Sequence, residues 1–171
     1  MNARHEEFDA VIVGARCAGA ATAMLMARAG LRVLVVDRTH PSRDTLSTHA
    51  LMRAGVLQLS RWGLLQRVVA AGTPPVTATT FHYGDSTETV QLSEPLYAPR
   101  RTVLDTVLLS AAQEAGAQTS FGVGVTELCR DRAGQVNGVL ARVRGGEAVR
   151  FRAPLTIGAD GLRSTVARLA G

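Results

Sequence analysis

Four residues near the start of the chain, Gly14, Arg16, Gly19 and Asp37, have the types and spacing needed to bind a dinucleotide. Residues 14–19 read Gly-Ala-Arg-Cys-Ala-Gly, which matches a dinucleotide fingerprint at its first and third glycines. Arg16 takes the place of the second glycine, where its guanidinium would add positive charge beside a pyrophosphate. Asp37 follows eighteen residues after Gly19, and its carboxylate can accept hydrogen bonds from both ribose hydroxyls. The alternative is a strand-turn-helix connection that binds no ligand.

A second polar motif lies near the end of the chain. Residues 158–161 read Gly-Ala-Asp-Gly, between an apolar segment at 155–157 and a predicted helical tail that runs to Gly171. Cys17 stands at a predicted helix N-terminus, a position where a reactive thiol is one interpretation, but the packing of a small residue is the simpler one. The two cysteines and four histidines have no metal-ligand spacing, so no metal site is predicted. No side chain is assigned as a catalytic acid or base.

A strand-helix-strand unit is expected to position the first motif. Residues 8–13 form a short apolar run typical of a strand buried on both faces. Residues 18–29 have a helical composition closed by Gly30, and residues 31–36 form a second buried strand that ends at Asp37. This order predicts a parallel sheet whose central strand is 10–13, with 31–36 on one side and the strand at 155–157 on the other.

The rest of the chain predicts an α/β fold with an antiparallel meander. We expect helices at 49–62, 64–71 and 101–115, and a hairpin of 76–83 with 86–92 around Gly84-Asp85. Short strands follow at 118–121, 123–129, 136–143 and 148–151. Residues 123–151 should form the meander, because glycines mark its turns. Its arginines at a spacing of two should face solvent; they are Arg130, Arg132, Arg142, Arg144, Arg150 and Arg152.

Length and composition narrow the class of protein. The 171 residues suit one domain, and 46% apolar with 19% charged residues is a globular composition that excludes extended disorder. The chain has 19 arginines, no lysine and 14 acidic residues, which gives a net charge of +5. This positive charge favours an anionic small ligand. Only seven aromatic residues accompany these charges, so nucleic-acid binding is not expected. The apolar segment 18–29 is too short to span a bilayer and no secretion signal precedes it, so we expect a cytoplasmic protein.

Taken together, the motifs resemble a family of flavoproteins. The turn at 14–19, the segment Leu-Arg-Val-Leu-Val-Val-Asp-Arg at 31–38 and the Asp-Gly pair at 160–161 resemble flavoprotein hydroxylases of the para-hydroxybenzoate hydroxylase type. Related geranylgeranyl reductases and flavin-dependent halogenases share them. The resemblance implies a Rossmann-like FAD-binding domain over residues 1–171, with 73–99 a stub of the substrate domain and the C-terminal part of the family fold missing.

The resemblance also implies which residues hold FAD. The turn would hold the pyrophosphate, Asp37 the adenosine ribose, and Arg38 would flank the adenine that the Val125 backbone also contacts. Arg53 and Arg101 would reach the phosphates and the ribityl side, and Asp160-Gly161 is tied to FAD and pyridine-nucleotide use. The implied cofactor-binding set is Gly14, Ala15, Arg16, Cys17, Ala18, Gly19, Asp37, Arg38, Arg53, Arg101, Val125, Asp160 and Gly161.

Three functions are consistent with this resemblance. The first is an NAD(P)H-dependent flavin monooxygenase that hydroxylates a small organic substrate. The second is a flavin-dependent reductase of isoprenoid double bonds, and the third is an inactive nucleotide-binding fragment or NAD-binding module. Arg101 and Asp160 favour FAD over NAD, whereas Ala167 stands where many family members have an arginine. The strand at 155–157 would lack a neighbour, so a homodimer through that sheet edge is expected.

Overall fold

The computed structural model describes residues 7–40, 44–45, 50–143 and 146–171. The chain forms two compact units, and each is treated by itself below. Unit one consists of Met1–Arg43 with Leu108–Gly171, and unit two of Asp44–Val107. The boundary falls within helix α4 (Arg101–Glu114).

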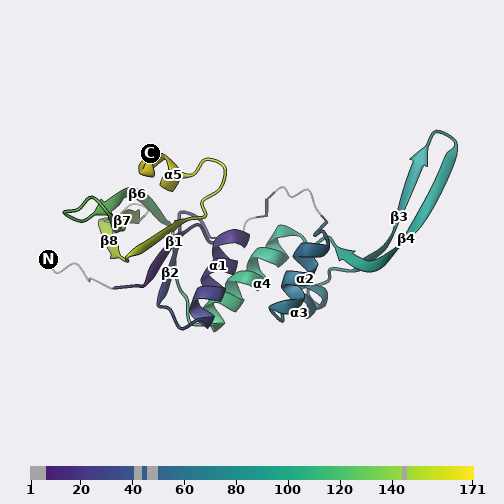
Figure 1. The fold of residues 1–171 in the computed structure, drawn as a ribbon, viewed down its shortest axis with the longest axis horizontal. Helices are drawn as coiled ribbons and strands as arrows, with labels where there is room; N and C mark the ends of the chain where they lie inside the picture. Colours follow the sequence, from purple (N-terminus) through teal and green to yellow (C-terminus); the bar gives the residue numbers. More distant parts are fainter. Residues whose placement is uncertain (1–6, 41–43, 46–49, 144–145) are drawn as a thin grey trace. The chain divides into compact units, whose positions relative to one another are not determined.

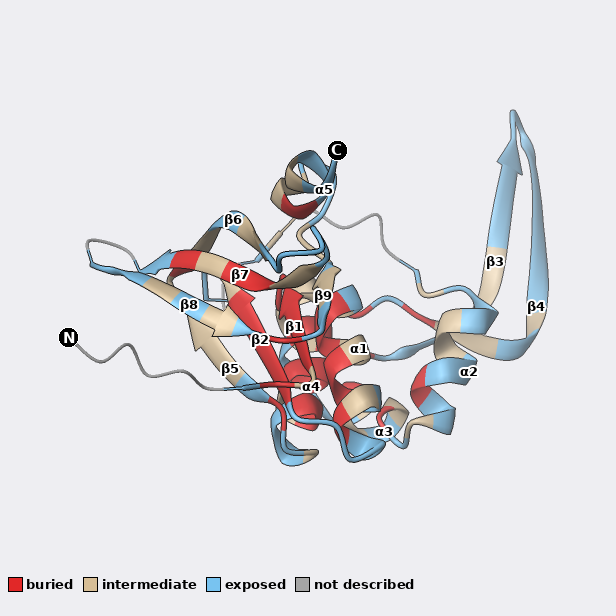
Figure 2. Cartoon of the chain, turned by 60° about the vertical axis from the view of Figure 1, so that its left-hand side comes forward, coloured by how far each residue is buried: buried red, intermediate tan, exposed pale blue. Residues whose placement is uncertain are grey.

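Unit one contains a four-stranded parallel sheet in the order β5-β2-β1-β9 (Figure 2). Its strands are β1 (Ala10–Val13), β2 (Val33–Asp37), β5 (Gln118–Phe121) and β9 (Leu155–Gly158). In the register of the sheet, Val11 pairs with Leu34 on one side and Thr156 on the other. The predicted central position of β1, between β2 and β9, is therefore confirmed.

Strand β5 corrects one sequence-based expectation. We grouped it with the short strands leading into the meander, but it pairs in parallel with β2, from Leu34 opposite Gln118 to Asp37 opposite Phe121. A strand that follows a helix commonly returns to a parallel sheet in this way.

Helix α1 (Cys17–Arg28) lies beside β1 and β2, and its buried side is made of small residues together with Met24. Ala20, Ala23 and Met24 have no exposed surface, and neither do Ala10 and Ile12 of β1. Small side chains allow the helix to approach the strands closely. Figure 2 shows the buried residues gathered in β1, β2 and α1.

The antiparallel meander packs against the face of the sheet that is opposite to α1. Its strands are β6 (Val123–Arg130), β7 (Val136–Val143) and β8 (Ala148–Arg152), in that order. One apolar cluster joins Val11, Leu34 and Val36 of the sheet to Val139 and Ala141 of the meander. Alternation along β1 therefore sends odd-numbered residues to the meander and even-numbered residues away from it.

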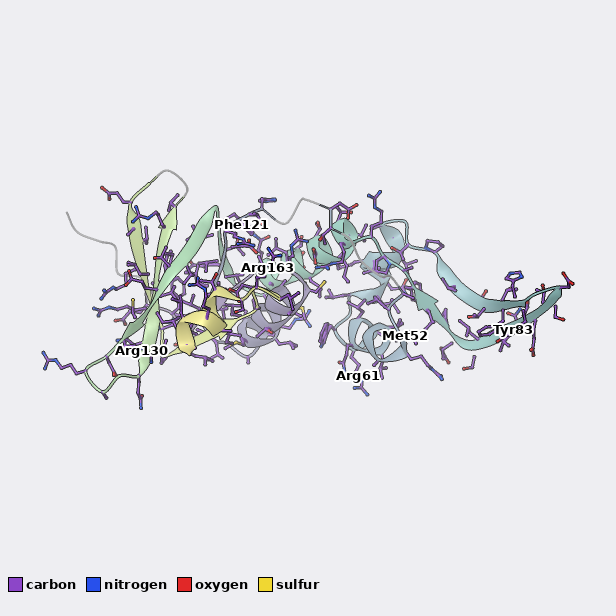
Figure 3. The ribbon with its side chains drawn as sticks, turned by 90° about the horizontal axis from the view of Figure 1, so that it is seen from above. Met52, Arg61, Tyr83, Phe121, Arg130 and Arg163 are labelled. Carbon is purple, nitrogen blue, oxygen red and sulfur yellow. The ribbon has the colours of Figure 1, made fainter. Side chains whose placement is uncertain are left out.

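The meander arginines face solvent, as expected. Those that the structure describes, namely Arg130, Arg132, Arg142, Arg150 and Arg152, are all exposed. Arg144 lies outside the described residues. Arg130, labelled in Figure 3, is the last residue of β6. Its Nη1 donates to the Gly134 carbonyl at 2.9 Å.

Unit two contains two short helices and a long hairpin. The helices are α2 (Arg53–Arg61) and α3 (Leu65–Ala70), and the hairpin pairs β3 (Pro75–Tyr83) with β4 (Ser86–Tyr97). Most hairpin residues are exposed, and Tyr83 lies near the tip (Figures 1 and 3).

Helix α2 starts later than the predicted residue 49, which lies outside the described residues. The Leu51 N–H donates to the Tyr97 carbonyl at 2.7 Å in an antiparallel bridge. This contact holds Leu51 in extended backbone, so the helix begins at Arg53. Strand β4 runs beyond its predicted end at residue 92 because Leu96 and Tyr97 pair with Val76 and Pro75 of β3.

The chain ends in helix α5 (Thr165–Ala170). Within the described ranges, no helix has both the length and the apolar character needed to cross a membrane.

Candidate functional site

The glycine turn lies at the carboxyl end of β1 and is shaped by two close backbone contacts. Gly14 has φ +108°, and a β-carbon on it would lie 2.3 Å from the Ala159 carbonyl oxygen. A β-carbon on Gly19 would lie 1.8 Å from the Gly14 carbonyl oxygen. Both glycines are therefore required by geometry, the first for the bend and the second for close packing of α1.

Arg16 takes the place of the fingerprint's second glycine without breaking the turn. It is the N-cap residue of α1 in extended backbone, with φ −88° and ψ −168°. Its side chain is partly exposed, as is that of Cys17, while Ala18 is exposed and Ala15 is buried. A guanidinium at this end of the helix adds to the positive potential of the N-terminus.

Asp37 at the end of β2 is bonded directly to the glycine turn. Its Oδ2 accepts the Ala15 N–H at 2.9 Å. Its Oδ1 accepts both the N–H of Thr39, at 2.8 Å, and the Thr39 hydroxyl, at 3.1 Å. The predicted ribose-binding carboxylate and the predicted pyrophosphate turn are thus brought together at one edge of the sheet. Thr39 is a member of this network that our sequence analysis missed, although an Asp-x-Thr sequence after a strand is a recognised turn signal.

An aromatic pair lies at the same edge of the sheet. Phe121 is opposite Asp37 in the register of β5 and β2, and the ring of His40 packs against it with centroids 4.8 Å apart. Arg38 is exposed next to Asp37. Val125 lies in β6 and packs against the apolar cluster beneath the meander, so its contact with adenine stays a prediction.

Asp160 is occupied by hydrogen bonds to the start of α5. Its Oδ1 accepts the Ser164 hydroxyl at 2.5 Å, and its Oδ2 accepts the N–H groups of Thr165 at 2.6 Å and Val166 at 3.2 Å. Burial raises the pKa of Asp160, but these hydrogen bonds together outweigh burial and hold the pKa below its ordinary value.

Ser164 completes this cap and was also missed in the sequence analysis. Its Oγ accepts the Ala167 N–H at 2.9 Å, which is the usual role of a serine before a helix. A serine directly before an apolar helical segment is the signal that could have identified it. Gly161 is exposed with φ +85° and places the turn between Asp160 and α5.

The two remaining predicted residues belong to unit two. Arg53 is the exposed first residue of α2. Arg101 is the first residue of α4, and its Nη2 donates to both carboxylate oxygens of Asp105, at 3.0 and 3.2 Å. Asp105 has no exposed surface, so this ion pair is largely removed from water. The roles of Arg53 and Arg101 toward a cofactor stay predictions.

A hollow at the opposite end of the sheet is not part of this site. It has a volume of about 310 Å³ and is lined by Glu7, Phe8, Arg32, Val33, Gly116 and Gln118. Ligands of open parallel sheets bind beyond the carboxyl ends of the strands, where the glycine turn lies. Among the described residues, no group of three or more histidine, cysteine or acidic side chains is arranged to hold a metal ion.

A family described as "FAD binding domain" matches residues 7–171. The chain belongs to this FAD-binding domain family. The predicted family resemblance is confirmed, and so is the predicted class of fold, a parallel sheet with helices and an antiparallel meander. The residues of the site fit FAD, because the N-terminus of α1 follows the carboxyl end of β1, where anionic groups bind, and the Asp37 carboxylate is bonded to the same turn.

Two curated relatives match nearly the whole of this chain. Protein FixC of Escherichia coli strain K12 is 34% identical, over 96% of this chain and 39% of the relative. Digeranylgeranylglycerophospholipid reductase 2 of Methanopyrus kandleri is 29% identical, over 96% of this chain and 40% of the relative. The chain therefore spans about two-fifths of the length of these relatives.

Two solved structures share the fold of the FAD-binding domain. The flavin-dependent brominase Bmp2 has a TM-score of 0.83 at 22% identity, covering 96% of this chain and 41% of its own. The flavin-dependent monooxygenase PieE, solved with FAD and substrate, has a TM-score of 0.79 at 25% identity, covering 97% of this chain and 32% of its own.

Proposed function

We propose that the chain is the FAD-binding part of an NAD(P)H-dependent flavin monooxygenase that hydroxylates a small organic substrate in the cytoplasm. The observation that carries FAD binding is the contact between Asp37 and Ala15, because it joins a ribose-binding carboxylate to a pyrophosphate-binding turn. FAD supplies the redox chemistry when bound, and the protein binds and orients it. The similarity to the monooxygenase PieE supports this choice of reaction.

In this proposal, each cofactor-binding residue contacts one part of FAD. The N–H groups of residues 14–19 and the N-terminus of α1 hold the pyrophosphate, aided by the Arg16 guanidinium. Asp37 binds the ribose, and Arg38 and Val125 flank the adenine. The other proposed contacts come from Arg53, Arg101 and the Asp160-Gly161 turn.

A reductase of isoprenoid double bonds is the second candidate. The name of the Methanopyrus kandleri relative favours it. Mixing the FAD-loaded chain with NADH or NADPH, with and without dioxygen, separates the candidates. Flavin reduction followed by dioxygen-dependent hydroxylation supports a monooxygenase, and dioxygen-independent turnover of an isoprenoid supports a reductase. A chain that binds FAD but is not reduced by either nucleotide is a binding fragment.

FAD binding itself is tested with a pair of variants. Asp37→Ala should weaken FAD binding by about 10- to 100-fold, because a charge-assisted hydrogen bond contributes about 1.5–3 kcal/mol. Cys17→Ala should have a smaller effect, because Cys17 offers packing and a backbone amide that alanine retains. Flavin fluorescence titrations measure both affinities. Equal losses in the two variants would show that Asp37 is not the ribose ligand.

We also propose that two copies of the chain pair through the β9 edge. In the described sheet, β9 has β1 on one side and no strand on the other, and Leu155 in β9 is 46% exposed. Unpaired backbone groups on an edge strand favour pairing between chains. Light scattering on a size-exclusion column should give twice the 18.0 kDa mass of one chain. A monomer that retains stoichiometric FAD would contradict this arrangement.

A further inference from the structure

The carboxylate of Asp37 has little acceptor capacity left for a ligand. An ionised carboxylate offers about four lone-pair sites, two on each oxygen. Thr39 uses both sites on Oδ1, one through its N–H and one through its hydroxyl. Ala15 uses one site on Oδ2. The remaining site is on Oδ2, the oxygen that also contacts the glycine turn.

A carboxylate with both oxygens available can accept hydrogen bonds from two adjacent ribose hydroxyls, one on each oxygen. Here the second oxygen is already engaged, and a second ribose hydroxyl could reach Oδ1 only by displacing the hydroxyl of Thr39. The Thr39 N–H would stay bonded in either case, because it belongs to the backbone turn that follows β2. The hydroxyl of Thr39 therefore competes with one hydroxyl of the ligand.

We infer that Asp37 receives a single ribose hydroxyl, and that Thr39 is the residue that determines this. The inference rests on the proposed binding of FAD and deepens it, because it sets how the adenosine end of the ligand is recognised. The hydroxyl bound at Oδ2 is the 2′-hydroxyl, since that is the group usually bound by an acidic residue after the second strand of this fold. Thr39 acts as a specificity-determining residue through Asp37.

Two substitutions separate the hydroxyl of Thr39 from its other features. Thr39→Val removes the hydroxyl but keeps the branched shape and the backbone N–H. Thr39→Ser keeps both the hydroxyl and the N–H and removes only a methyl group. Because Thr39 is exposed, neither change disturbs the apolar core.

The probes are ADP, 2′-deoxy-ADP and 3′-deoxy-ADP, titrated by calorimetry against the full chain. For the unmodified protein, 2′-deoxy-ADP should bind about 10-fold or more weakly than ADP. By contrast, 3′-deoxy-ADP should bind less than about 3-fold more weakly than ADP. In Thr39→Val both deoxy compounds should bind more weakly than ADP by comparable factors, because Oδ1 becomes free to accept. Thr39→Ser should keep the asymmetry of the unmodified protein.

Three results would overturn the inference. Equal losses for the two deoxy compounds on the unmodified protein would show that both carboxylate oxygens bind the ribose. An unchanged asymmetry in Thr39→Val would show that Thr39 does not control it. A chain that binds neither FAD nor ADP would instead refute the proposed function, and the inference with it. Partial unfolding of Thr39→Val would lower the apparent affinities for all three probes by the same factor, so the ratios among the probes still report the folded variant.

Discussion

The α-carbon of Gly19 stands so close to the carbonyl oxygen of Gly14 that an added β-carbon would lie 1.8 Å from that oxygen. The first turn of α1 is thereby pressed against the residue at which β1 ends. Ala159 closes the other side of Gly14, with its N–H donating to the Val13 carbonyl at 2.7 Å. The position of the glycine turn is thus set by backbone-to-backbone contacts, which leave no room for a side chain at either glycine.

Gly19→Ala should therefore remove FAD binding and destabilise unit one. The new methyl group meets backbone rather than a movable side chain, so α1 must shift away from β1. Thermal melts and FAD titrations measure the two effects. The control is Gly146→Ala, where the added β-carbon would lie 3.5 Å from the Val143 β-carbon, an ordinary contact. Similar melting temperatures for the two variants would contradict this account.

Asp105→Asn should lower the free energy of unfolding by about 3 kcal/mol, because it removes one partner of a buried ion pair. Asp105 has no exposed surface, and asparagine cannot accept from Arg101 with two oxygens. The matched control is Asp44→Asn, which breaks the exposed pair with Arg100 and should cost far less. Urea denaturation compares them. Equal losses would show that burial of Asp105 does not determine the effect.

Thr156→Val should stabilise the protein by about 1 kcal/mol. The Thr156 hydroxyl is buried and has no hydrogen-bond partner among the described residues. Valine keeps the shape and removes the unsatisfied group. Thr156→Ser keeps the hydroxyl, loses a methyl group and should be destabilising. A valine variant that is less stable than the original protein would show that the hydroxyl is not an unsatisfied buried group in solution.

The contribution of Asp160 to stability should depend on pH. Its folded-state pKa is below the ordinary value of 3.8, so the stabilisation is present above pH 3.8 and is lost as pH falls through the folded-state pKa. Asp160→Asn cannot accept all three hydrogen bonds and should be less stable than the original protein at about pH 6. This difference should narrow at about pH 3.

Denaturation curves of both proteins at the two pH values give the test. Other carboxylates with lowered pKa values, such as Asp9 and Asp44, titrate equally in both proteins and cancel in the comparison. A difference that stays constant with pH would mean that Asp160 does not stabilise the folded state as a carboxylate.

The parallel core could be predicted because its strands are buried on both faces. Strands β1 and β2 are short continuous apolar runs, which is the pattern typical of parallel strands covered on both faces. Strand β5 reads Gln-Thr-Ser-Phe and lies at the sheet edge, so only its pairing with β2 identifies it as a parallel strand. Its composition is equally suited to an exposed antiparallel strand, and so its place could not be read from the sequence.

The sequence predicted which residues lie together in the candidate site, but it did not predict the hydrogen bonds between them. Gly14, Gly19 and Asp37 follow from spacing, because the turn and the second strand have nearly fixed lengths in this fold. The engagement of Asp37 by Thr39 depends on local turn geometry, which the residue types permit without requiring. Asp160 was also singled out from the sequence, but the hydrogen bonds of its carboxylate to the start of α5 depend on local geometry in the same way. Its contact with a cofactor stays a prediction.

The exposed hairpin of β3 and β4 makes the chain unevenly sensitive to proteases. Residues 68–99 contain no arginine, and the chain has no lysine, so trypsin has no site in the hairpin however far it opens. Chymotrypsin can cleave after Phe81 and Tyr83, which lie beside the tip and are 43% and 66% exposed. Local opening of a two-stranded ribbon is easy compared with global unfolding. A brief chymotryptic digest should therefore nick the chain at its hairpin, whereas a tryptic digest leaves one long peptide that reports the hairpin whole.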